Sequence, residues 1–298
     1  EMGQVLAGSR SLADWSTISF GYTIISPLHW GEAAMEVFAQ TSGFGAPMMI
    51  NSEPTSGATA PVTLGGTLML GNAEALSGVV ILQTLEPGRP VVFNLGFAHT
   101  MDMRKAVTRT GGPENGMLHA AGAQLAAFHD LPSASWMSTE SMAADEQAAY
   151  EKTTTGLMQA LGGVNIIWGI GQLESQRTMS LAQMVIDNEI AGVCLRAAKP
   201  IATDDESLAY DLIAEMGYEP DYLGHEHTLS RFRSELFETE LGFVGWRESW
   251  QNAGAKTAIE RAHDRVSEIL AADPEPHVDE DTLRELLKIE ERWRTELA

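Results

Sequence analysis

The chain has 298 residues, 44% of them hydrophobic, and a formal net charge of −22 at pH 7. A sequence of this size can bury one large core or two smaller ones, and its negative charge excludes the basic surface that nucleic acids and anionic membranes require. The single cysteine, Cys194, predicts a reducing, cytoplasmic location, and the lack of a leader or of about 18 consecutive apolar residues predicts no membrane span.

Short apolar runs alternate with longer helical stretches over the first 200 residues. We expect strands at 17–25, 47–50, 90–94, 133–137 and 164–168, and helices at 31–41, 64–85, 113–129, 145–161 and 180–198. The strand cores are continuously apolar, which is typical of parallel strands covered on both faces. Strand–helix units in series therefore predict a parallel α/β fold in residues 1–200.

The number of units bears on the architecture, because a closed (β/α) TIM-type barrel needs eight and this sequence gives about five. Either the first part of the barrel is missing on the N-terminal side or the sheet is open. Residues 201–298 are charged and favour helices, which predicts a helical C-terminal extension packing on the barrel, with a linker at 273–278. Its last segment carries an apolar helical stripe: Leu283, Leu286, Leu287, Trp293 and Leu297.

Ligands of parallel α/β folds bind where the strands end at their carboxyl edge. Two tryptophans, Trp136 and Trp168, lie at two adjacent strand ends, and indole faces attract quaternary ammonium groups. With a carboxylate such as Glu140 or Glu174, they would form a cage for a methylated amine. A third aromatic residue, Phe93, lies at the end of another predicted strand. The alternative is that these aromatic side chains simply fill the barrel interior, and we favour that interpretation for Phe93.

A second cluster, His225 and His227, has the spacing that places two imidazoles on one face of an extended segment. This pair leaves open a metal-dependent barrel hydrolase. The remaining six histidines show no matching ligand spacing, and no Walker motif, CxxC or Gly-x-Ser-x-Gly is present. We therefore expect no directly bound metal, and the residues alone predict no reaction.

Several segments together resemble the trimethylamine methyltransferase family, in order and spacing over nearly the whole chain. They are GATAPVT at 57–63, NAE at 72–74, PGRPV at 87–91, MDMR at 101–104, GPE at 112–114, AAGAQLA at 120–126, YEK at 150–152, GGVN at 162–165, DNE at 187–189 and LGHEHT at 223–228.

The resemblance implies a longer (β/α) barrel that moves a methyl group from an amine nitrogen to the cobalt of a corrinoid (cobalamin) carried by a separate small protein. The corrinoid would lie over the carboxyl mouth of the barrel, so we expect Asn51, Glu53, Met101 and Asp102 to face it. We also expect the chain to form a homo-oligomer. A barrel that only docks the corrinoid protein, without catalysis, is the remaining alternative.

The sequence departs from the founding members of that family, which use pyrrolysine at a region that matches 169–174 here. Members without pyrrolysine are similar to glycine betaine and other quaternary amine demethylases, so the expected substrate is a quaternary or tertiary amine. Gln172 joins the expected substrate-binding residues. If the substrate carries a carboxylate, then His225, His227 or Arg177 would meet it.

Overall fold

A five-stranded parallel sheet forms the centre of the computed structural model, which describes residues 1–15, 18–218, 221–272 and 277–296. The strands lie side by side in chain order: β1 (Phe20–Thr23), β2 (Met48–Asn51), β4 (Val91–Gly96), β7 (Ser133–Trp136) and β8 (Ile166–Trp168). All five predicted strands are confirmed, although Thr17, in the first of them, lies outside the described residues.

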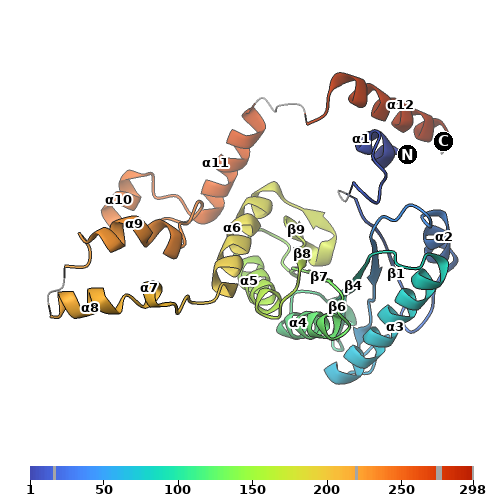
Figure 1. Cartoon of the computed structure of the whole chain (residues 1–298), viewed down its shortest axis with the longest axis horizontal. Coiled ribbons are helices and arrows are strands. Elements are labelled where there is room, and N and C mark those ends of the chain that lie inside the picture. The colour runs from blue at the N-terminus through green and yellow to red at the C-terminus, as the bar shows by residue number, and fades with distance from the viewer. Residues whose placement is uncertain (16–17, 219–220, 273–276, 297–298) are drawn as a thin grey trace.

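Five helices follow these strands and cover one side of the sheet: α2 (Glu32–Gln40), α3 (Leu64–Leu85), α4 (Pro113–Phe128), α5 (Glu146–Leu161) and α6 (Leu181–Ala198). Each matches a predicted helix to within two residues at either end. In Figure 1 the strands form an arc, with these helices around its outer side. The parallel α/β fold predicted for residues 1–200 is therefore confirmed.

Local sequence explains where three of the helices begin. Pro113 occupies the first turn of α4, where its missing N–H costs nothing. The side chain of Asp145 accepts a hydrogen bond from the backbone N–H of Ala148 at the start of α5, at 3.0 Å, and Ser180 caps α6 through Gln183 in the same way.

Alternation along the strands divides their side chains between two faces. Met48, Ile50 and Phe93 point toward the helices and join Leu82 and Leu118 in the main core. Phe93 is fully buried there. It is a core residue, as expected, but it lies between the sheet and the helices and not on the inner face, because its side chain alternates with that of Val92. The opposite, inner face carries a second cluster of Met49, Val92 and Ala134, against which Trp168 packs.

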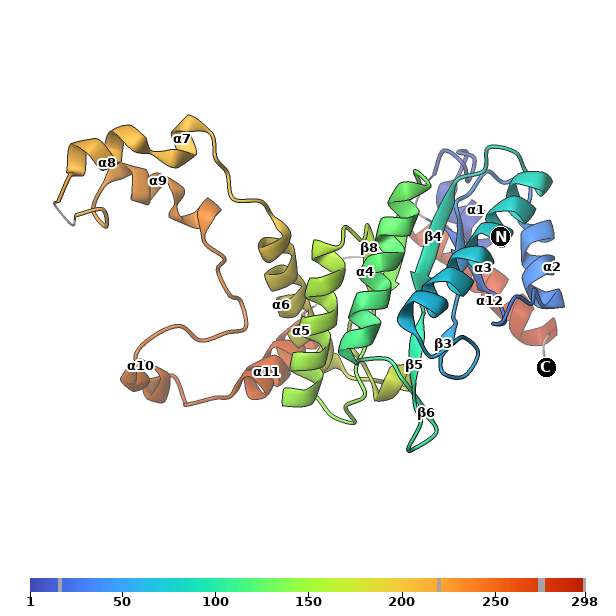
Figure 2. The ribbon, with the colours of Figure 1, turned by 90° about the horizontal axis from the view of Figure 1, so that it is seen from below.

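Further short strands were not predicted from the sequence. A three-stranded sheet, in the order β3-β5-β6, is formed by β3 (Thr55–Ser56), β5 (His99–Asp102) and β6 (Val107–Arg109). In Figure 2 β5 and β6 extend beyond the end of β4. A hairpin of β9 (Gln172–Leu173) and β10 (Thr178–Met179) follows β8, with the short 3-10 helix Glu174–Gln176 between its strands. A short helix, α1 (Met2–Ala7), precedes the sheet.

The helices within the described part of 201–298 are α7 (Asp205–Leu208), α8 (Tyr210–Met216), α9 (Glu226–Glu235), α10 (Arg247–Asn252), α11 (Ala258–Ala271) and α12 (Glu280–Glu296). The segment 199–257, here called the arm, leaves α6 and returns as α11, which packs along α6 (Figure 2). Helix α12 lies beside α1 and contains the residues of the predicted apolar stripe up to Trp293. The last residue of that stripe, Leu297, lies outside the described residues, and so do residues 273–276 of the predicted linker.

Helix α3 differs from expectation in one respect. Among the described residues it is the one helix long and apolar enough to cross a membrane, judged by length and composition alone. Glycine, serine, threonine and asparagine interrupt its apolar residues, which is why no unbroken apolar run was visible in the sequence. One side of α3 packs on β2, β4 and α4, and its single charged residue, Glu74, is fully buried.

Candidate functional site

Three aromatic side chains meet at the carboxyl ends of neighbouring strands. Trp136 and Trp168 are paired in register on β7 and β8, so both point to the same face of the sheet. Their rings are edge to face with centroids 5.7 Å apart, and Phe97, which directly follows β4, lies 5.1 Å from Trp136 and 6.1 Å from Trp168. The predicted proximity of the two tryptophans at adjacent strand ends is confirmed, and the structure adds Phe97 to form an aromatic triad.

The triad contains unsatisfied polar atoms. The indole nitrogens Nε1 of Trp136 and Trp168 are buried and have no hydrogen-bond partner within the described residues, and the same holds for Oε1 of Gln172. A buried indole N–H normally finds a partner, because leaving it unpaired costs about 1–3 kcal/mol. The two indole N–H groups therefore mark the triad as a place where a ligand with a hydrogen-bond acceptor, such as a carboxylate, would be stabilised.

A polar layer lies next to the triad on the inner face. The amide of Asn94 donates to Oδ1 of Asn51 at 2.7 Å, and Oδ1 of Asn94 accepts from the backbone N–H of Gly96 at 2.8 Å. Asn51 in turn reaches the hydroxyl of Thr23 at 3.4 Å. Hydrogen bonds thus link β1, β2 and β4, and Asn51 serves to fix the carboxyl ends of these strands.

Glu140 follows β7, but its carboxylate is already engaged. Oε1 accepts hydrogen bonds from the backbone N–H and the hydroxyl of Thr110, at 2.6 and 2.9 Å, from the N–H of Gly111 at 3.1 Å and from the hydroxyl of Ser175 at 3.2 Å. Oε2 is buried, 3.8 Å from Nε of Arg109. The side chain therefore ties together the loops on either side of it.

The 3-10 helix between β9 and β10 is strained. Glu174, Ser175 and Gln176 all have left-handed φ values, of 51°, 51° and 78°, a conformation that costs roughly 1–2 kcal/mol for each non-glycine residue. Two backbone hydrogen bonds hold it, from Glu174 N–H to the carbonyl of Ser141 and from Ser175 N–H to the carbonyl of Thr139, both 2.9 Å. The carboxylate of Glu174 accepts from Thr178 at 2.6 Å.

A buried ion pair supports the loop that joins β8 to β9. Lys152 of α5 and Asp187 of α6 are paired, and both side chains are fully buried. Nζ of Lys152 donates to the carbonyl of Gly169 at 3.1 Å, while Asp187 accepts from the N–H of Gly171 at 2.6 Å and from Gln183 at 2.7 Å. Burial lowers the pKa of Lys152 and raises the pKa of Asp187, and each partner opposes the shift of the other. The pair fixes the backbone directly after Trp168.

Any other residue at Gly169, within that loop, would strain the backbone. Its φ is 103°, and a Cβ atom there would lie 2.2 Å from the carbonyl oxygen of Met137. The close approach of this loop to the end of β7 keeps the two tryptophans adjacent.

The residues expected to face a corrinoid lie near the same edge of the sheet. Glu53 follows β2, and its Oε1 is 3.2 Å from Nε2 of the buried His99 on β5. Met101 is half-buried on β5, and Asp102 closes the turn after it by accepting from the backbone N–H groups of Arg104 and Lys105. Those hydrogen bonds lower the pKa of Asp102.

His225 and His227 do not join the triad. The segment is the start of helix α9 rather than an extended strand, because Nδ1 of His225 caps the helix by accepting from the N–H of His227 at 3.1 Å. Helix α9 belongs to the arm, on the far side of α6 from the sheet (Figures 1 and 2). In the described ranges no group of three or more His, Cys, Asp or Glu side chains could hold a metal ion. Arg177 is exposed, between β9 and β10.

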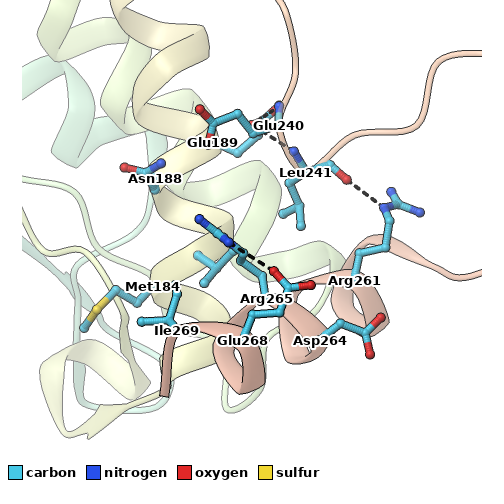
Figure 3. Close-up of a pocket in the computed structure, with 11 residues that line it drawn as sticks. Met184, Asn188, Glu189, Glu240, Leu241, Arg261, Asp264, Arg265, Glu268 and Ile269 are labelled. Atoms are coloured by element: carbon cyan, nitrogen blue, oxygen red, sulfur yellow. Dashed lines mark hydrogen bonds and ion pairs between the residues drawn. The ribbon is translucent and has the colours of Figure 1, made fainter. Parts of the chain in front are cut away.

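A cleft of about 520 Å³ lies elsewhere, between α6 and α11 (Figure 3). Its charged groups are largely paired: Glu189 accepts from the backbone N–H groups of Glu240 and Leu241, Arg261 donates to the carbonyl of Leu241 at 2.7 Å, and Arg265 pairs with Glu268. These contacts hold the returning arm against α6, so we interpret the cleft as a structural junction.

Sequence reasoning missed Phe97 and the Lys152–Asp187 pair as parts of the site. Phe97 carried a usable signal, because it is a third aromatic residue at a strand end. Lys152 lies on the buried side of α5 together with Ala148, Thr155 and Gln159, and a charged residue within such a helical stripe requires a buried partner.

The sequence model of the family "Trimethylamine methyltransferase (MTTB)" matches residues 1–298. The chain is 35% identical to trimethylamine methyltransferase MttB of Desulfitobacterium hafniense, over 95% of this chain and 58% of that protein, and 35% identical to MttB of Methanosarcina barkeri, over 89% and 53%. It is 32% identical to a glycine betaine methyltransferase of D. hafniense, over 86% and 53%. The chain thus spans about half the length of the curated relatives it matches.

Among solved structures, the chain resembles the monomethylamine methyltransferase MtmB of Methanosarcina barkeri, with a TM-score of 0.51 over 86% of this chain and 50% of that one. The sequence identity in this comparison is 14%, so the likeness concerns the fold alone.

Proposed function

The chain belongs to the trimethylamine methyltransferase family, and from that premise we propose that it carries the amine site of a corrinoid-dependent methyltransferase acting on a quaternary amine such as glycine betaine. The observation that carries this proposal is the aromatic triad of Phe97, Trp136 and Trp168 at the carboxyl edge of the sheet. A quaternary ammonium donates no hydrogen bond, so aromatic faces are the groups that recognise it best.

We propose that the five-stranded sheet is part of a closed (β/α) barrel. The strands are all parallel and follow chain order, and the helices lie on one side, as in barrels. Among the residues that the structure describes, β1 and β8 end the sheet and are each paired on one edge only. The relatives are longer than this chain, which leaves room for the remaining units in the whole protein.

The reaction would require little from acid–base chemistry. As the methyl group moves, the C–N bond breaks with its electron pair staying on nitrogen, so a quaternary ammonium leaves as a neutral tertiary amine. Reduced corrinoid, when bound, supplies the nucleophilic cobalt that accepts the methyl group. The aromatic triad would hold the ammonium in place and keep water away from it, which is consistent with an inner face of apolar and amide side chains.

The carboxyl edge is suited to a large polar partner. Asn51, Glu53, Met101 and Asp102 belong to β2 and β5 or directly follow β2, and we propose that they face the corrinoid protein. Of the cationic groups that would meet a substrate carboxylate, Arg177 belongs to the same hairpin as Gln172, whereas His225 and His227 are in the arm. We therefore propose Arg177 for that role.

The test is a methyl-transfer and binding panel. Glycine betaine, carnitine, proline betaine and trimethylamine are offered in turn with cob(I)alamin, and the loss of its visible absorbance is followed. We expect a response to at least one quaternary amine and none to trimethylamine. If no compound changes the spectrum and none binds in calorimetry, the proposal fails.

A variant pair connects the response to the triad. Trp168→Ala should weaken quaternary amine binding by about 1–2 kcal/mol through loss of a cation–π contact. Trp246→Ala is the matched control, because Trp246 is 86% exposed at the start of α10 in the arm. Equal affinities for the parent chain and Trp168→Ala would show that Trp168 only fills the interior.

A further inference from the structure

An open pocket of about 470 Å³ lies at the junction of α10 and α11, two helices labelled in Figure 2. Here called the α10–α11 pocket, it is lined chiefly by Phe243, Arg247, Trp250, Lys256, Thr257 and Arg261. Its volume is within the range of pockets that bind small molecules and cofactors. Three of its lining residues are cationic, two are aromatic and none is a carboxylate, although the chain has 41 Asp and Glu against 19 Lys and Arg.

Two other clefts of the arm follow the acidic composition of the chain. One is lined by residues that include Glu238, and the other by residues that include Asp205, Glu206 and Asp211. Carboxylates within a pocket repel anionic ligands, whereas a lining of cations attracts them. The α10–α11 pocket is therefore the one of these three that suits an anion.

Backbone carbonyls hold the cationic and aromatic groups of the pocket in place. The carbonyl of Lys256 accepts hydrogen bonds from Nε1 of Trp250, at 3.1 Å, and from Nη1 of Arg261, at 2.5 Å. Nε of Arg261 donates to the carbonyl of Leu241 at 2.7 Å. A carbonyl orients a guanidinium group without cancelling its charge, so Arg261 stays positively charged and fixed in position.

Several donors remain available for a ligand. Within the described residues Arg247 makes no hydrogen bond or ion pair, and its guanidinium carbon lies 5.9 Å from the centre of the Trp250 ring. Nη2 of Arg261 also has no hydrogen-bond partner there. Lys256 is paired with Asp264, but both side chains are about half exposed, so this pair is weak. Guanidinium groups with free N–H donors bind phosphate oxygens in a fork geometry.

We propose that the α10–α11 pocket binds a nucleoside diphosphate, an inference that does not depend on the proposed catalysis. Its phosphates would lie against Arg247 and Arg261, and its base would stack on Phe243, whose ring is 38% exposed. The net charge of the chain opposes any anion, but at 0.15 M salt that repulsion is screened beyond about 8 Å. Direct contacts with the two guanidinium groups act at much shorter range.

The test is calorimetry of the full chain with ADP, pyrophosphate and adenosine in turn. We expect ADP to bind with a Kd below about 1 mM, and pyrophosphate and adenosine to bind at least roughly tenfold more weakly. Arg247→Ala should weaken ADP binding by about tenfold or more. Arg233→Ala is the matched control, because Arg233 lies 5.0 Å from the Phe232 ring in α9 and lines the cleft that contains Glu238; it should leave ADP binding unchanged.

A second variant separates the base from the phosphates. Phe243→Leu keeps an apolar side chain but removes the ring, so it should weaken ADP binding and leave pyrophosphate binding unchanged. Failure of ADP to bind at about 1 mM would overturn the proposal, and so would equal affinities of the parent chain and Arg247→Ala for ADP. Pyrophosphate binding as tight as that of ADP would also overturn it, since the pocket would then recognise phosphate groups alone.

Discussion

His119 shows how burial controls the charge of a single side chain. It lies in α4, fully buried, and its Nε2 donates to the carbonyl of Ala98 at 3.0 Å. Burial, followed by the neighbouring His99, lowers the pKa of His119 from 6.5 to about 3. The ring is therefore neutral in the folded protein at any pH at which the fold is expected to persist.

This pKa has a consequence for stability against pH. Below pH 6.5 the unfolded chain binds a proton at His119 and the folded chain does not, so the free energy of unfolding falls as the pH drops toward 3. The slope from this group is about 1.4 kcal/mol per pH unit. In His119→Gln the side chain no longer titrates. The difference in the free energy of unfolding between the parent chain and this variant should therefore become smaller as the pH falls from 6 to 4.5. Urea unfolding curves measure this, and parallel pH profiles for the two proteins would contradict it.

Individual residues also show what the sequence could and could not predict. The two tryptophans were predicted to lie together because parallel strands end at one edge, and they do. The role of Glu140 was not visible, because its four donors come from segments about 30 residues away along the chain. The donors that a carboxylate contacts are set by the tertiary structure, and a pattern of neighbouring residues in the sequence does not show them.

At the level of elements, the five strands and five helices of the sheet region were predictable because each is long enough to show its own periodicity and punctuation. Strands β3, β9 and β10 contain two residues each, too few for any pattern, and the loops around them position them. The start of α9 was misjudged as extended, because a histidine acting as the N-cap gives no familiar capping signature.

The Lys152–Asp187 pair joins two elements and should behave as a unit. Lys152→Met leaves a carboxylate buried without its cation, which we expect to lower the free energy of unfolding by about 3–5 kcal/mol. The double variant Lys152→Met with Asp187→Leu removes both charges and should recover part of that loss, because the N–H of Gly171 and the amide of Gln183 then lack their acceptor. Urea unfolding of the parent chain, both single variants and the double variant gives the coupling energy. A double variant as unstable as the sum of the two singles would mean that the pair does not act together.

The architecture of the whole was predicted less completely than its parts. The sequence predicted five strand–helix units, and the sheet has five strands, but the sequence left open whether the sheet closes into a barrel. The path of the arm could not be foreseen, because its helices are short and its contacts with α6 involve backbone groups, such as the carbonyl of Glu235 that accepts from Arg196.

The left-handed turn at Glu174–Gln176 connects two segments that are far apart in the sequence. The carbonyls of Ser141 and Thr139, in the loop after β7, accept from its backbone N–H groups, and the hydroxyl of Ser175 donates to Glu140 in the same loop. A change in the position of one segment would therefore be passed on to the other, so the loop after β7 and the hairpin that carries Gln172 are positioned as one unit.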